Sequence, residues 1–282
     1  MITIFSIPKA FQGHTLIIQT NAIKSWTRLN PPPQIILFGD EPGTAQMAED
    51  AGLQHIPQIE CNQFGTPLLH NVFAQAHRLA NQPILAYVNA DIILLNDFLP
   101  AIEQVRLAFL ERFLILGRRV DLAVTEPMNF ATPAWESKLR HRAAQEGVLA
   151  ARVCKDYFVF HQPLFAEIPP FAVGRGHWDN WMVYAARRMG LPVIEATKVV
   201  TAIHQNHDYS HVPGGRGQVY VTSQEAKQNA KLAGGMHLVE GTAVTWQLTQ
   251  RGLKPKRLPA LVLFLADLPR FCKLLIELFS PI

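Results

Sequence analysis

The stretch Ile84-Leu-Ala-Tyr-Val-Asn-Ala-Asp-Ile-Ile-Leu-Leu95 places two polar side chains, Asn89 and Asp91, inside a long apolar run. Such a run predicts a strand that is buried on both faces. A buried carboxylate at the end of a strand is costly unless a cation or several donors lie beside it. Because ligands of open α/β sheets bind at the carboxyl ends of strands, Asp91 is a candidate contact for a metal or a sugar phosphate. The alternative is that residues 89–91 only cap the next helix.

Apolar runs alternate with helical spacing from the N-terminus to this stretch. Strands are predicted at residues 2–7, 34–38, 55–59 and 84–88, and helices at 14–29, 44–51 and 66–80, the last with Thr66 as N-cap and Pro67 in its first turn. This alternation predicts a parallel sheet with helices on both faces. Asp40 follows the second strand and Asp91 the fourth, so we expect them to meet at one edge of the sheet.

The rest of the chain continues this pattern less regularly. Helices are predicted at 98–116 and 136–151, strands at 121–125, 156–160, 192–196 and 199–203, and a further helix after the loop 169–181. We therefore expect one α/β domain over residues 1–252, with a mostly parallel, Rossmann-like central sheet flanked by helices. G-x-G-x-x-G and G-K-[ST] motifs are missing, which disfavours Rossmann dinucleotide enzymes and P-loop NTPases.

The composition is that of a globular protein with a large core, since 49% of the 282 residues are hydrophobic and 17% charged. The net charge of +4, without a basic block longer than residues 254–257, argues against a nucleic-acid partner and suits anionic substrates or a membrane surface. Three cysteines without C-x-x-C spacing argue against a disulfide framework and a thiolate zinc site. We expect a reducing, cytoplasmic location, because the first residues also lack the basic region of a signal peptide.

A second group of polar and aromatic residues lies in Gly174-Arg-Gly-His-Trp-Asp-Asn-Trp181. Indole rings such as Trp178 commonly stack on sugars, and a carboxylate beside them, here Asp179, can act as a general base for a hydroxyl. Arg175 and Asn180 are candidate contacts for the same ligand. The alternative is that Asp179 caps a helix while the tryptophans pack in the core.

A third group is His204-Gln-Asn-His-Asp-Tyr-Ser-His211, which follows a predicted strand. Imidazole nitrogen and carboxylate oxygen together suit Mn²⁺, Mg²⁺ or Zn²⁺. The spacing of His204 and His207 is compatible with a pair of metal ligands, although the H-E-x-x-H motif of zinc proteases is missing. We therefore expect at least one of these histidines to bind a metal or a phosphate.

The order of these features along residues 1–210 resembles the nucleotide-diphospho-sugar transferases of the GT-A glycosyltransferase fold. In that family an Asp-x-Asp motif lies at the position of Asn89-Ala-Asp91, and its last Asp coordinates a divalent metal. The resemblance therefore implies that Asp91 binds Mn²⁺ or Mg²⁺ together with His204 or His207. Asn89 departs from the motif and adds no charge, but its amide can still contact a ribose hydroxyl.

The same resemblance implies roles for three further residues. Asp40 matches an acidic residue that contacts the base or ribose of the donor. Asp179 lies where inverting members carry the carboxylate that activates the acceptor, and Arg175 is a candidate cation for the leaving diphosphate. The implied activity is metal-dependent transfer of a sugar from a nucleotide-diphosphate donor to a hydroxyl of a glycan, lipid or small-molecule acceptor. The alternatives are a metal-dependent phosphoesterase and a non-catalytic protein that binds sugar nucleotides.

The C-terminal segment 253–282 predicts an amphipathic helical tail. Its polar residues Asp267, Arg270, Lys273 and Glu277 fall on one helical stripe, and the remaining face is apolar. This pattern fits a helix lying in a membrane surface, which would make the protein peripheral to the membrane. It fits equally a helix that packs on the domain or on a second subunit in a dimer.

Overall fold

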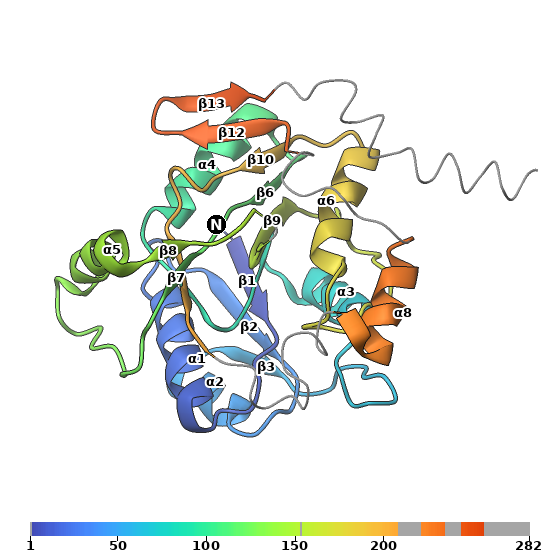
Figure 1. Cartoon of the computed structure of the whole chain (residues 1–282), viewed down its shortest axis with the longest axis horizontal. Helices are drawn as coiled ribbons and strands as arrows, with labels where there is room; N and C mark the ends of the chain where they lie inside the picture. Colours follow the sequence, from blue (N-terminus) through green and yellow to red (C-terminus); the bar gives the residue numbers. More distant parts are fainter. Residues whose placement is uncertain (1, 153, 208–220, 235–243, 257–282) are drawn as a thin grey trace, which may run out of the picture.

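The computed structural model of the chain describes residues 2–152, 154–207, 221–234 and 244–256 (Figure 1). Asp208, His211 and almost all of the predicted tail lie outside these residues, so their predicted roles stay predictions. The helices are α1 (Gly13–Trp26), α2 (Thr44–Ala51), α3 (Leu69–Leu79), α4 (Phe98–Phe109), α5 (Trp135–Glu146), α6 (Trp178–Arg188) and α8 (Gln224–Leu232). None of the helices in the described ranges is long and apolar enough to span a bilayer.

The main sheet of the described chain has nine strands in the order β13-β12-β10-β6-β9-β4-β1-β2-β3. Its strands are β1 (Ile2–Ser6), β2 (Gln34–Phe38), β3 (Gln54–Ile56), β4 (Ile84–Val88), β6 (Leu114–Leu116), β9 (Tyr157–His161), β10 (Val193–Glu195), β12 (Trp246–Thr249) and β13 (Gly252–Pro255). Five neighbouring pairs are parallel, whereas β9 runs antiparallel to β4 and β6, and β13 antiparallel to β12. The expected mostly parallel sheet is therefore confirmed.

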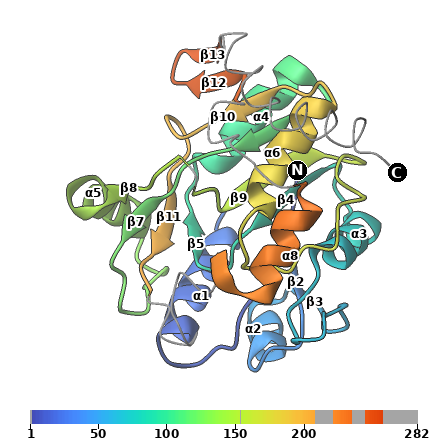
Figure 2. The same cartoon turned by 45° about the vertical axis from the view of Figure 1, so that its right-hand side comes forward.

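A second sheet of four strands lies beside the first, in the order β5-β11-β7-β8 (Figure 2). It contains β5 (Ile92–Leu94), β11 (Ala202–Gln205), β7 (Val120–Leu122) and β8 (Val148–Leu149). The chain passes from the first sheet to the second through residues 89–91, which separate β4 from β5. The polar pair in the long apolar run thus marks the joint between two sheets.

Two hydrophobic clusters cover the two faces of the main sheet. On β4 the alternate residues Ile84, Ala86 and Val88 pack with α1 and α4, while Leu85 and Tyr87 pack with α3 and α6 on the opposite face. Every residue of β4 is buried, as the apolar run predicts. This burial fixes the position of the strand whose carboxyl end carries Asp91.

Several predicted elements differ from the structure at their ends. The predicted helix 98–116 ends at Phe109, because Leu110 has a φ of 54°, and residues 114–116 form β6. The helix predicted from Thr66 begins at Leu69, since Pro67 and Leu68 pair with Cys61 and Ala172 in β-bridges. The helix predicted over 136–151 ends at Glu146, and β8 follows it. The strand predicted at 199–203 lies at 202–205 instead. Apolar spacing alone could not distinguish short strands from the helices beside them.

The hairpin of β12 and β13 crosses the predicted boundary between residues 252 and 253. β13 pairs antiparallel with β12 along Gly252–Pro255, at the edge of the main sheet. The first residues assigned to the tail therefore belong to this sheet. The division of the chain into a domain and a tail stays a prediction beyond this point.

Gly117 packs closely against Tyr157, so that a Cβ atom at Gly117 would collide with the Tyr157 hydroxyl. A substitution of Gly117 therefore tests this packing. Tyr157 is buried, and its hydroxyl has no hydrogen-bond partner among the described residues. We expect Gly117→Ala to lower the free energy of unfolding by about 1–3 kcal/mol through overpacking. Tyr157→Phe should recover part of this loss in the double variant, as measured by urea unfolding. Additive effects of the two substitutions would contradict the collision.

Candidate metal centre and donor site

Asp91 lies at the joint between the sheets and is held there by β11. The antiparallel pair of β5 and β11 sets His204 opposite Ile92, the residue after Asp91. The buried side chain of Gln205 donates from Nε2 to the Asp91 carbonyl oxygen at 3.2 Å and accepts from Asn21 of α1 at 3.0 Å. The backbone position of Asp91 is therefore fixed by a strand more than a hundred residues away, whose own side chains turn toward the same carboxylate.

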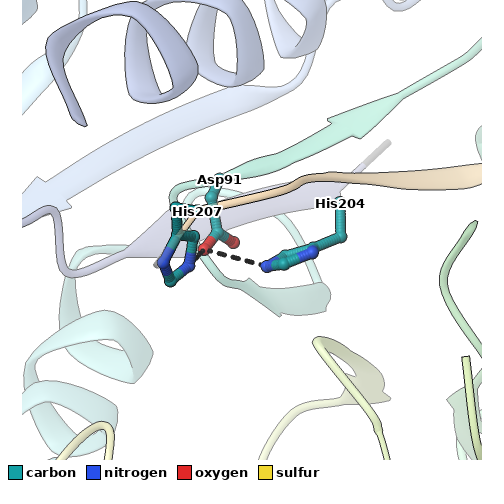
Figure 3. Close-up of side chains that lie close together, drawn as sticks. All are labelled: Asp91, His204 and His207. Atoms are coloured by element: carbon teal, nitrogen blue, oxygen red, sulfur yellow. Dashed lines mark hydrogen bonds and ion pairs between the residues drawn. The ribbon is translucent and has the colours of Figure 1, made fainter. Parts of the chain in front are cut away.

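Three side chains meet at this joint: Asp91, His204 and His207 (Figure 3). The Asp91 Oδ2 atom is 3.2 Å from His207 Nε2 and 3.6 Å from His204 Nε2. The two imidazole rings are 5.2 Å apart between centroids. Burial raises the pKa of the Asp91 carboxyl, but His204 and His207 lower it by more, so the pKa lies well below the usual range. The structure thus brings together all three predicted metal ligands.

The residues at this joint fit a divalent cation. One carboxylate oxygen and two imidazole nitrogens are donors that transition metals such as Mn²⁺ accept. Two donors that share one small ion at about 2.1 Å lie roughly 3–3.5 Å apart, which is close to the separations found here. The other carboxylate oxygen, Asp91 Oδ1, is buried without a hydrogen-bond partner among the described residues. A bound cation would supply that partner.

A ring of charged groups surrounds the triad. Asp156, just before β9, accepts hydrogen bonds through Oδ1 from Asn89 Nδ2 at 2.8 Å and from Arg119 Nη1 at 2.9 Å. Arg119 also donates from Nε to Asp121 Oδ1 at 2.8 Å. The same Asp121 oxygen lies 2.9 Å from His204 Nδ1. Asn89 therefore binds a carboxylate of the protein itself, which uses part of the amide that we expected to contact ribose.

Sequence reasoning did not select Arg119, Asp121 or Asp156 as site residues. Asp156 comes before its strand rather than after it, and only the antiparallel direction of β9 brings it to the carboxyl end of β4. The available signal was a charged residue flanking a fully apolar strand. Its use would have required knowledge of the strand direction.

Asp179 lies in the first turn of α6, near Lys155 and Asp156. Burial raises the pKa of its carboxyl, the Lys155 ammonium lowers it in part, and the Asp156 carboxylate raises it again. Lys155 is itself buried and donates to Asn180 Oδ1 at 2.8 Å. The predicted base is thus a partly buried carboxyl with an elevated pKa, within electrostatic reach of the charged groups around the triad.

Two other residues of this segment have different surroundings from those expected. Trp178 is only 5% exposed and packs against Tyr87 and Phe158, with ring centroids 5.2 and 5.3 Å away. This packing argues against stacking of Trp178 on a sugar, because the ring fills the core beneath β4. Arg175 forms an ion pair with Glu225 of α8 at 2.6 Å, so its charge is already matched within the protein.

Asp40 is exposed and follows β2 at the same edge of the sheet as Asp91. The expectation that the two carboxylates meet is wrong, because β1 lies between β2 and β4. Two strand spacings separate these strands by about 10 Å. A ligand that contacts both residues must therefore be extended along the edge.

Comparison with known proteins identifies the architecture. No protein-family model and no curated protein sequence matches the chain. Among solved structures, the chain is similar to glucosyl-3-phosphoglycerate synthase from Mycobacterium tuberculosis in complex with phosphoglyceric acid, with 16% identity and a TM-score of 0.51 over 84% of this chain and 81% of that one. The same enzyme in complex with Mn²⁺, UDP and phosphoglyceric acid gives 12% identity and a TM-score of 0.50, over 84% and 79% of the two chains.

The chain has the GT-A fold. This confirms the predicted fold class, including the helices on both faces of a mostly parallel sheet. The triad of Asp91, His204 and His207 lies at the carboxyl end of β4, an interior strand of this GT-A sheet between β9 and β1. Which ligands these residues bind is a separate question from the fold.

Substitution of Asn89 tests the charged groups around the triad, because a carboxylate at this position would face Asp156 Oδ1 at hydrogen-bond distance. We expect Asn89→Ala to cost about 1 kcal/mol in the free energy of unfolding, the usual loss of one hydrogen bond. Asn89→Asp, which restores Asp-x-Asp, should cost more, because it adds repulsion between two carboxylates. Urea unfolding in EDTA should show the extra loss at pH 8 and a smaller one at pH 5, where a carboxyl of this pair takes up a proton. Equal stability of Asn89→Asp and wild type would contradict this account.

Proposed function

We propose that the protein is a divalent-metal-dependent glycosyltransferase, which transfers a sugar from a nucleotide-diphosphate donor to a hydroxyl of a small-molecule acceptor. The observation that carries this proposal is the triad of Asp91, His204 and His207 at the carboxyl end of β4 in a GT-A fold. Metal ligands at that place put a cation where ligands of open α/β sheets bind.

The donor is best taken as a uridine diphosphate sugar. Structures of the similar synthase contain UDP or UDP-glucose with Mn²⁺, and one contains Mg²⁺ with UDP. In this chain Asp40 and Asp91 follow strands β2 and β4, which end at one edge of the sheet and are about 10 Å apart, counted as two strand spacings. A nucleoside diphosphate can span that separation, with its nucleoside toward Asp40 and its diphosphate toward Asp91. Asp40 would then accept a hydrogen bond from the base or ribose.

The chemistry divides between the triad and Asp179. Asp91, His204 and His207 would hold a divalent cation, which would offset the negative charge on the leaving diphosphate. Asp179 takes the proton from the acceptor hydroxyl as the oxygen of that hydroxyl attacks the anomeric carbon. An elevated pKa makes Asp179 a stronger base than an ordinary carboxylate, provided that the pH keeps it ionised.

Asp91→Asn tests the metal and donor site. We expect wild type to bind UDP in the presence of Mn²⁺ and to lose this binding in EDTA, as measured by calorimetry. The variant should bind Mn²⁺–UDP at least about tenfold more weakly, because a neutral amide replaces the anionic ligand. Asp50→Asn on the exposed face of α2 is the matched control and should bind as wild type does. Absence of Mn²⁺–UDP binding to folded wild type would overturn the proposal and favour the phosphoesterase.

Asp179→Asn tests the catalytic base. We expect transfer from UDP-glucose to fall by about 10²–10⁴ while Mn²⁺–UDP binding is kept, because only proton transfer is lost. In wild type the acid limb of the pH–rate profile should lie above the ordinary aspartate pKa of about 3.9, since the raised pKa keeps Asp179 protonated up to a higher pH.

Two other outcomes would change the proposal. Full activity of Asp179→Asn, with the anomeric configuration of the donor retained in the product, would exclude Asp179 as base. Binding of Mn²⁺–UDP to wild type without turnover of any donor sugar would favour a non-catalytic binding protein. Product configuration is read by NMR, and glycan and lipid acceptors are assayed beside small molecules.

A further inference from the structure

We propose that the edge of the main sheet opposite the candidate metal site carries a surface that binds anionic lipid membranes. We call it the amino-edge surface, because it lies at the amino ends of β6 and β10. It combines exposed apolar side chains with basic ones, and its residues are Leu107, Leu110, Arg112, Arg188, Met189, Lys254 and Lys256. The proposal goes beyond the proposed function, since it concerns where the protein is held and not what it transfers.

The direction of the strands places this surface away from the triad. β6 and β10 are parallel, and β6 is also parallel to β4, because both β4 and β6 run antiparallel to β9. Asp91 follows the carboxyl end of β4, so the amino ends of β6 and β10 lie at the opposite edge of the sheet. Figures 1 and 2 show α4, β10 and the hairpin of β12 and β13 grouped on one side of the molecule. A membrane bound at the amino edge leaves the donor site open to solvent.

Hydrogen bonds bring the separate segments of the surface together. The segment after α4 meets the segment after α6, because Arg112 Nη2 donates to the Met189 carbonyl oxygen at 3.1 Å. The Lys256 amide donates to the Thr245 carbonyl oxygen at 2.6 Å, and the Thr245 amide donates to the Val193 carbonyl oxygen at 2.9 Å. Val193 is the first residue of β10. The end of β13 therefore lies at the same edge as the ends of α4 and α6.

Three large apolar side chains of this surface are exposed to solvent. Leu107 and Leu110 are 67% and 68% exposed, and Met189 is 40% exposed. Leu107 and Leu110 are three residues apart at the end of α4, which is the spacing of neighbours on one helix face. Apolar side chains that gather on a surface beside polar ones mark a site of protein or membrane contact. Removal of these side chains from water would supply the apolar part of lipid binding.

Basic side chains accompany the apolar ones. Arg112, Arg188 and Lys254 are exposed, and Lys256 is half-buried. In the described ranges none of these four residues forms an ion pair with a carboxylate. Glu111, next to Arg112, is exposed and offsets one of the positive charges. Lysine and arginine beside apolar side chains are the combination that binds anionic lipid surfaces.

Charge distinguishes a lipid surface from two other occupants, the segment 257–282 of this chain and a second copy. The part of the chain that the structure describes reaches Lys256 inside the amino-edge surface, and Arg257 and the apolar run 258–266 follow in the sequence. The segment 257–282 has three basic and two acidic side chains, so it offers no excess of negative charge. A second copy would place the basic surface against itself. Anionic lipid complements the charge of both the surface and the segment that follows it.

The test measures cosedimentation of the full chain with vesicles of phosphatidylcholine alone and of phosphatidylcholine mixed with phosphatidylglycerol. Leu110→Asn removes apolar area, and asparagine is chosen because it tolerates the φ of 54° at this position. Arg188→Gln removes one exposed charge. Phe64→Asn and Lys198→Gln are the matched controls, because these exposed residues follow the carboxyl ends of β3 and β10. Circular dichroism confirms that each variant is folded.

We expect wild type to bind the mixed vesicles, to bind less in high salt and to stay in solution with phosphatidylcholine alone. Binding should fall about tenfold in Leu110→Asn and about fivefold in Arg188→Gln, whereas both controls should bind as wild type does. Mn²⁺–UDP binding should be unchanged in all four variants, and its absence from wild type would bear on the proposed function alone.

Three outcomes would overturn the proposal. One is a wild type that does not bind the mixed vesicles. The second is equal binding by wild type, Leu110→Asn and Arg188→Gln, which would assign lipid binding to another part of the chain such as 257–282. The third is a wild-type dimer that ignores the vesicles and that Leu110→Asn dissociates in analytical ultracentrifugation, which would make a second copy the occupant of this surface.

Discussion

The structure around the candidate site depends on one constraint, the burial of the Asp91 carboxylate at the end of a fully buried strand. Removal of a carboxylate from water is costly and raises its pKa, so the charged form needs partners. His204 of β11 and His207, two residues after that strand, supply them, and together they lower the pKa by more than burial raises it. β11 must therefore lie beside β5, and this pairing creates the second sheet and its joint with the first.

The same constraint explains the distribution of charge around the triad. Asp156 is buried and Asp179 is partly buried, and burial raises the pKa of both carboxyls. Positive groups lie beside them, Arg119 at Asp156 and Lys155 near Asp179. A further carboxylate at position 89 would add repulsion to this group, whereas the neutral amide of Asn89 donates a hydrogen bond into it. The departure from Asp-x-Asp thus has a local electrostatic reason.

The GT-A fold and the charged groups around the triad make different contributions to the proposed activity. The fold places the carboxyl ends of β2 and β4 along one edge, which gives an extended donor a surface with Asp40 and Asp91 at separate points. The charged groups around the triad fix the side chains near Asp91, through contacts that run from one sheet to the other. A transferase needs both, because its transition state is stabilised by groups that are already in place before reaction.

The sequence by itself determined the elements whose signal is local. The apolar run 84–88 predicted β4, its polar end predicted Asp91, and the histidines after a predicted strand predicted the other two members of the triad. Only the tertiary structure decided the antiparallel direction of β9, the register of β7 with β11, and the burial of Trp178. These features join residues far apart in the chain, and a local pattern of polar and apolar residues does not encode which strands become neighbours or in which register they pair. For that reason Asp91 was visible in the sequence, and Arg119, Asp121 and Asp156 were not.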